Sequence, residues 1–120
     1  MSNQSKQIKQ ATSDMQCIQQ GDVVLHRIHA IPEGAVKLEP GPRGYILAHG
    51  ESGHFHCIEA NPGVSAYQLT DGSMCVVMDE PQVLTHEEHN HIALPAGTMY
   101  KTGRVKEVDP FAREVRNVAD

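Results

Sequence analysis

Short apolar runs separated by turn-forming residues are the feature that most constrains the fold of this chain. From Asp22 onward each run is too short for an ordinary helix and is bounded by Gly, Pro, Asn or Asp, which favour turns. Such spacing is typical of strands in a β-sandwich or a small barrel. We therefore predict an all-β domain with strands in residues 22–31, 44–50, 53–60, 64–70, 73–80, 90–95 and 98–108.

Residues 64–78 give the clearest local prediction. Asp71 and Gly72 stand between two runs rich in β-forming residues. A type I′ turn needs positive φ at both central residues, and Asp-Gly adopts it readily. We predict a β-hairpin here.

The two ends of the chain differ from the middle. Residues 1–20 are rich in Gln, Ser and Lys, so we predict a polar arm, held by a neighbouring subunit or by the domain's own sheet edge. At the other end, Asp109 and Pro110 suit the start of a short helix. One face of that helix would carry Phe111, Val115 and Val118. We expect the helix to pack on the sheet of a single β domain spanning residues 21–120.

Composition excludes several classes of protein. A chain of 120 residues suits one domain, and its net charge of −5, with no cluster of Lys or Arg, argues against nucleic acid as a partner. There is no apolar run long enough to cross a membrane, and the polar first residues lack the pattern of a secretory signal. The cysteines show no CxxC pairing. We expect a cytoplasmic protein with reduced thiols.

The histidines are the candidates for chemistry. The chain has 8 of them, and two pairs, His54/His56 and His89/His91, are spaced two apart. Residues two apart in a strand share a face, with Cα atoms roughly 6.5 Å apart, so each pair could converge on one ion. Imidazole suits zinc, iron and nickel, and a carboxylate such as Glu59 would favour iron or manganese. We predict a divalent transition metal bound by His54, His56, His89, His91 and Glu59.

Simpler interpretations compete with the metal site. Both pairs of histidines could lie on exposed polar surfaces without any metal. Strict alternation also places Glu59 on the face opposite His54 and His56, so Glu59 joins them only if the strand ends or bulges. The same alternation would turn Phe55 and Cys57 towards the core.

The histidine spacing resembles that of the cupins. In that family a strand carries HxH followed by a glutamate, and a later PxG turn leads to a fourth ligand. His54, His56 and Glu59 look like the first set, and residues 95–97 look like the later turn. Tyr100 stands where the fourth ligand would be, which leaves His89 or His91 to replace it. The resemblance implies a metal centre inside a small double-sheet barrel.

The overall frame also resembles a set of small proteins of bacteria and their phages. The segments that carry this resemblance are residues 20–23, 49–51, 53–56 and 84–97. It implies a cytoplasmic or virion protein and brings no activity with it.

Two functions follow from the sequence. The first is a cupin-like metal-binding protein with a small-molecule ligand, whose pocket Tyr100 or His86 could line; the sequence does not decide whether such a protein is an enzyme. The second is a non-enzymatic assembly protein that forms a homo-oligomer through its N-terminal arm. Such a protein could be encoded by a phage.

Overall fold

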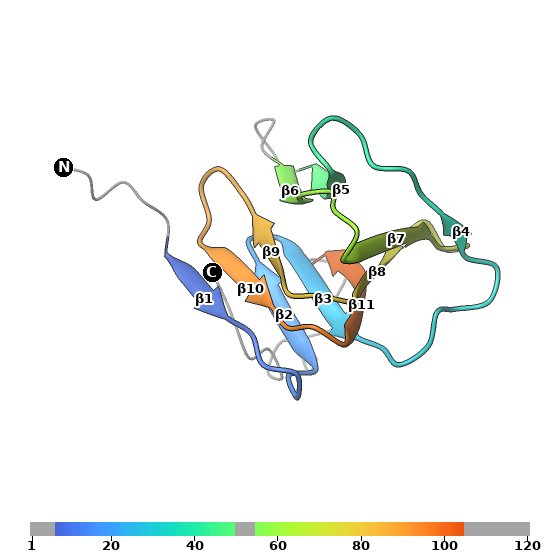
Figure 1. Cartoon of the computed structure of the whole chain (residues 1–120), viewed down its shortest axis with the longest axis horizontal. Coiled ribbons are helices and arrows are strands. Elements are labelled where there is room, and N and C mark those ends of the chain that lie inside the picture. The colour runs from blue at the N-terminus through green and yellow to red at the C-terminus, as the bar shows by residue number, and fades with distance from the viewer. Residues whose placement is uncertain (1–6, 50–54, 105–120) are drawn as a thin grey trace.

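The computed structural model describes residues 7–49 and 55–104, which form two β-sheets and no helix (Figure 1). The predicted all-β class is confirmed. From edge to edge, the five-stranded sheet contains β1 (Ile8–Gln10), β10 (His91–Leu94), β9 (Gln82–Thr85), β6 (Phe55–Ile58) and β5 (Tyr45–His49). The six-stranded sheet contains β2 (Cys17–Gln20), β3 (Val23–Arg27), β11 (Thr98–Arg104), β8 (Met74–Met78), β7 (Val64–Gln68) and β4 (Val36–Lys37).

The hydrophobic core takes side chains from both sheets. Neighbouring strands run antiparallel, apart from β1, which lies parallel to β10. Alternation along each strand turns every second side chain inward. Fully buried members of the core are Ile18, Leu25 and Tyr100 from the six-stranded sheet, and Ile58, Leu84 and Ile92 from the five-stranded sheet.

The hairpin predicted for residues 64–78 is confirmed. β7 and β8 pair from Val64↔Met78 to Gln68↔Met74. The amide of Gly72 donates to the carbonyl of Leu69 at 3.1 Å, and Gly72 has φ 91°. The connection is therefore a three-residue loop closed by a left-handed glycine, and the two-residue type I′ turn was the wrong prediction.

The expected orientation of strand β6 was wrong. We predicted that Phe55 and Cys57 would face the core, but His56 and Ile58 are the buried residues of β6, at 1% and 0% exposure. Phe55 and Cys57 are half-buried on the opposite face, where the guanidinium of Arg43 lies 4.6 Å from the centre of the Phe55 ring. His56 therefore lies on the core side of the sheet, not on a solvated one.

Two strands fall within the range predicted as a polar arm. β1 is the edge strand of the five-stranded sheet and pairs with β10, and β2 is an edge strand of the other sheet. Ala11 and Ile18 are buried at 1% and 0% exposure. The described part of residues 1–20 is therefore built into the domain's own sheets.

The predicted C-terminal helix, which would start at Asp109, lies outside the described residues. Within the described ranges, no helix with the length and apolar character needed to span a bilayer is found.

Candidate functional site

A polar cluster interrupts the apolar core at one end of the two sheets. It comprises three histidines, His56 on β6 with His86 and His89 after β9, together with Gln20 at the end of β2 and Asp22 in the β2–β3 turn. The centre of the His86 ring lies 4.3 Å from that of His56 and 4.6 Å from that of His89. The rings of His56 and His89 are nearly parallel, with centres 6.2 Å apart. Chain segments far apart in sequence thus gather their imidazoles in one place.

Gly21 lets the β2–β3 turn approach His89. Its φ is 58°, a left-handed conformation that side chains disfavour. A Cβ built at Gly21 would lie 2.5 Å from Nε2 of His89, well inside van der Waals contact. Only glycine therefore allows the imidazole of His89 to pack on this turn, between Gln20 and Asp22.

Gln20 fixes the tautomer of His56. Gln20 lies two residues after Ile18 and on the same inward face of β2. Its Nε2 donates to the carbonyl of Leu84 at 3.0 Å and to that of Asn90 at 2.8 Å. The carboxamide orientation is thereby set, and Oε1 of Gln20 must accept from Nδ1 of His56, 2.8 Å away. Nδ1 therefore carries a proton.

The other nitrogen of His56 faces a carboxylate. Nε2 lies 3.2 Å from Oδ1 of Asp22, whose Oδ2 accepts from a guanidinium nitrogen of Arg104 at 2.7 Å. Burial is the main cause that lowers the pKa of His56, to about 4, and the nearby imidazole of His86 acts in the same direction. The carboxylate of Asp22 opposes the shift but does not overcome burial, so we take the ring as neutral at pH 7.

His86 plays a different part in the cluster. It is buried, at 6% exposure, and its Nδ1 accepts from the amides of Glu88 and His89 at 3.0 and 3.2 Å. An accepting Nδ1 places the proton of the neutral ring on Nε2. His86 thus shapes the β9–β10 loop, and the loop in turn positions His89.

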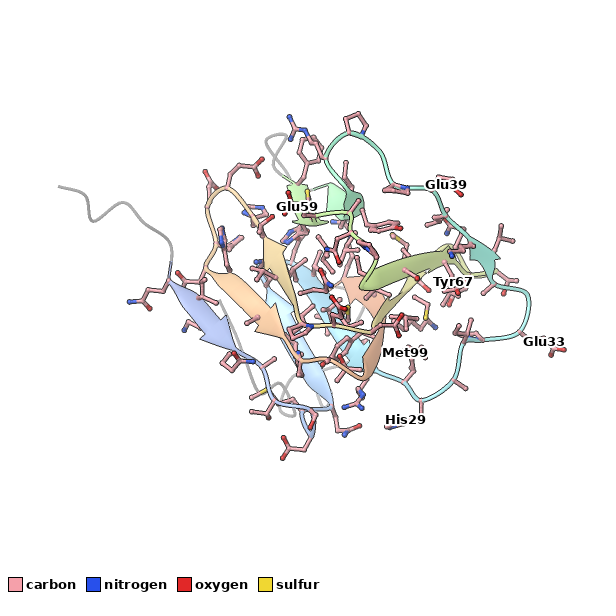
Figure 2. All side chains as sticks on the ribbon, viewed as in Figure 1. His29, Glu33, Glu39, Glu59, Tyr67 and Met99 are labelled. Atoms are coloured by element: carbon pink, nitrogen blue, oxygen red, sulfur yellow. The ribbon has the colours of Figure 1, made fainter. Side chains whose placement is uncertain are left out.

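The residues predicted from the sequence are placed as follows. His56 and His89 come together, and His86 joins them. His91 is half-buried on the face of β10 opposite the core residue Ile92. Glu59 is exposed directly after β6 (Figure 2). His54 lies outside the described residues.

Two members of the cluster, Gln20 and Asp22, were missed as site residues. The available signal was a glycine flanked by polar residues at the end of a strand-like run, Cys17 to Gln20. Such a turn can aim the side chains on both sides of the glycine at one neighbour. Nothing in the sequence indicated that this neighbour would be His56.

The chemistry open to the cluster is hydrogen bonding, proton exchange and metal coordination. Among residues 7–49 and 55–104, no group of three or more His, Cys, Asp or Glu side chains is arranged to hold a metal ion. His56 and Asp22 are a pair of donors rather than a complete coordination shell.

Comparison with known proteins gives a family. No curated protein and no solved structure matches the chain. The family model described as "Domain of unknown function (DUF8820)" matches residues 19–104, which is more than half of the chain and includes every member of the histidine cluster. The chain therefore belongs to the DUF8820 family.

Proposed function

We propose that this protein is a small cupin-like barrel that binds one divalent transition metal ion at His56. The observation that carries the proposal is the orientation of the His56 ring, with Nδ1 donating to Gln20 and Nε2 facing Asp22 at 3.2 Å. Metal-bound histidines characteristically donate their second N–H to an oxygen acceptor, which fixes the tautomer and aims the lone pair. Gln20 supplies such an acceptor.

A metal ion would account for the contact between His56 and Asp22. With the Nδ1 proton held by Gln20, the neutral ring presents a lone pair at Nε2 to the carboxylate oxygen. Two electron-rich atoms repel each other, and a proton or a metal ion between them turns this repulsion into attraction. A metal ion or an added proton at Nε2 would each satisfy this geometry, and measuring metal content separates the two.

The separation of the two donor atoms is compatible with a metal site. Tetrahedral coordination with Zn–N and Zn–O bonds of about 2.1 Å puts two ligand atoms roughly 3.4 Å apart. Nε2 of His56 and Oδ1 of Asp22 are 3.2 Å apart. Arg104 binds the second carboxylate oxygen, which leaves Asp22 one oxygen on the side of His56.

Other side chains would complete the coordination shell. His89 is the first candidate, because it packs against the turn that carries Asp22. His86 suits a supporting position instead, since its Nδ1 accepts two amides and its Nε2 is a donor. His54, predicted from its spacing to His56, is a further candidate. Zinc, iron, nickel and manganese all accept mixed imidazole and carboxylate ligands.

The location of the cluster supports the cupin-like part of the proposal. His56 and Gln20 come from different sheets and meet between them. A metal centre enclosed by two sheets is what the resemblance implies for a small barrel, and partial enclosure would leave one coordination position for water or a small ligand.

Elemental analysis tests the proposal. Untagged protein, purified without chelator, should contain close to one metal ion per chain by plasma mass spectrometry. His56→Ala should lose it, whereas His29→Ala, which removes an exposed imidazole, should retain it. Equal metal content in both variants, or a wild type that takes up none from zinc, iron, nickel or manganese solutions, would refute the proposal.

One observation favours the assembly function as a second candidate. β1 is an edge strand held by main-chain contacts to β10, including the Ala11 amide to the Ala93 carbonyl at 2.9 Å, and Ile8 is 60% exposed. The same pairing made with β10 of a second chain would produce an arm-exchanged homo-oligomer. Deleting residues 1–15 should then lower the mass measured by light scattering, and an unchanged mass would exclude the exchange.

A further inference from the structure

A cavity of about 650 Å³ opens beside the last residues of β11. Residues 101–104 of β11 form one wall, and the β7–β8 turn, residues 71–73, forms another. His26 of β3 and the small apolar residues Leu47 and Ala48 of β5 complete the lining. This volume lies within the range of roughly 300–1,000 Å³ typical of small-molecule sites.

The cavity lining carries more cations than carboxylates, in contrast to the chain as a whole. The lining includes two permanent cations, Lys101 and Arg104, and one carboxylate, Asp71, together with the imidazole of His26. The chain as a whole has a net charge of −5. Each cation already has a carboxylate partner, Asp71 at 2.8 Å for Lys101 and Asp22 at 2.7 Å for Arg104, so an anion would share these cations with the carboxylates.

Lys101 is positioned by its neighbours. Its Nζ lies 2.8 Å from Oδ2 of Asp71, and this contact, followed by those from Ser73, holds the pKa of Asp71 below its usual range. An ammonium group has three donors, so Lys101 can bind Asp71 and an anion together. β11 thus places the ammonium group at the cavity wall, where Asp71 competes with an anion for it.

Glycines leave the cavity open on two sides. A Cβ at Gly72 would meet no atom within 4 Å, so the turn adds no side chain there. A Cβ at Gly103 would lie 3.6 Å from Nε2 of His26, which places that nitrogen over the same part of β11. A compact ligand could therefore approach Lys101 and His26 closely.

We propose that this cavity binds a compact anionic small molecule whose carboxylate or phosphate group is held by Lys101, with Arg104 adding positive charge and the imidazole of His26 adding a polar contact. The inference does not rest on the metal proposed at His56. Arg104 nevertheless connects the two places, because it lines the cavity and also donates to Asp22.

Titration with two probes tests the proposal. Inorganic phosphate and malonate, each added at constant ionic strength, should shift the backbone amide resonances of Gly72, Ser73 and Gly103 to saturation at millimolar concentration. The probe that binds more tightly identifies the anion class. Shifts that do not saturate with either probe, or that occur equally over the whole surface, would overturn the proposal.

Two charge variants should act in opposite directions. Lys101→Gln should weaken binding about five-fold or more, the effect of losing one charged contact. Asp71→Asn keeps the oxygen that accepts from Ser73 but removes the competing charge, so binding should tighten several-fold. Lys37→Gln removes a positive charge from exposed β4 at the edge of the same sheet and should change nothing beyond error. Equal effects of Lys101→Gln and Lys37→Gln, or weaker binding in Asp71→Asn, would overturn the proposal.

Discussion

Replacing Gln20 with leucine is the most informative single change in the candidate site. Leu is similar in volume to Gln, so the packing of the core is largely preserved, whereas three hydrogen bonds are lost. The carbonyls of Leu84 and Asn90 lose their donor, and Nδ1 of His56 loses its acceptor. The variant thus removes the group that fixes the His56 ring without touching a proposed metal ligand.

The size of the effect follows from these three hydrogen bonds. A buried polar group left without a partner costs about 1–3 kcal/mol, and Gln20 itself is 1% exposed. At about 1 kcal/mol for each of the three groups, the metal-free protein should lose about 3 kcal/mol of unfolding free energy. Small domains have unfolding free energies of about 5–15 kcal/mol, so most of the variant should still be folded.

Urea unfolding of metal-free protein measures this loss. Gln68→Leu is the matched control, because Gln68 is exposed and its side chain donates one hydrogen bond, to the Ser73 carbonyl at 3.1 Å. The control should lose less than about 0.5 kcal/mol. Zinc affinity should also fall about 10- to 100-fold in Gln20→Leu, because the lone pair of His56 is no longer aimed. Equal losses of stability in the two variants, or unchanged zinc affinity, would refute the role assigned to Gln20.

Three further predictions concern the turn, the imidazole and the thiols. Gly21→Ala should destabilise the protein by at least about 1 kcal/mol more than Gly72→Ala in thermal unfolding, since both glycines have positive φ but only Gly21 lies against a side chain; equal costs would contradict the close packing of His89. In metal-free protein the pKa of His56 is lowered to about 4, so the folded state binds fewer protons than the unfolded state. The unfolding free energy that neutral His56 contributes should therefore be fully present above about pH 6.5 and be lost towards pH 4, by an amount on the order of 3 kcal/mol. His56→Gln should abolish this dependence. An unfolding free energy that rises on acidification would show a protonated His56 paired with Asp22. A thiol reagent should modify Cys57 before the buried Cys17 and Cys75, and a fast phase that persists in Cys57→Ser would contradict the orientation of β6.

The strand pattern was predictable because it depends on local chemistry. Turn residues punctuate the chain at nearly every strand end, and the hairpin around Gly72 required only its immediate neighbours. The turn type was not predictable in the same way. Leu69 and Ser73 extend the pairing by one step, and the loop then needs three residues rather than two.

The orientation of β6 could not be read from the sequence alone. One face carries Phe55 and Cys57 and the other carries His56 and Ile58, so each face offers apolar side chains to the core. The usual assumption puts Phe55 inside and His56 outside. The observed choice follows from Gln20, a residue of the other sheet, which satisfies the buried imidazole. A long-range hydrogen bond of this kind leaves no trace in the local pattern.

The candidate site was predictable only in part, because it too depends on contacts between segments far apart in the sequence. His56 and His89 were recognised from histidine spacing, but spacing places His91 and His89 on one face only if both lie in a strand. β10 begins at His91, and His89 belongs to the loop before it. The two imidazoles are therefore separated, and the loop, shaped by His86, directs His89 towards Gly21 and Asp22.

The most direct test of the metal proposal is an anomalous diffraction map of crystals grown with zinc. We expect a peak between His56 and Asp22, about 2.0–2.2 Å from both Nε2 and Oδ1. A peak at His91 or Glu59 instead, or no peak at His56 in crystals that diffract well enough to show one, would contradict it.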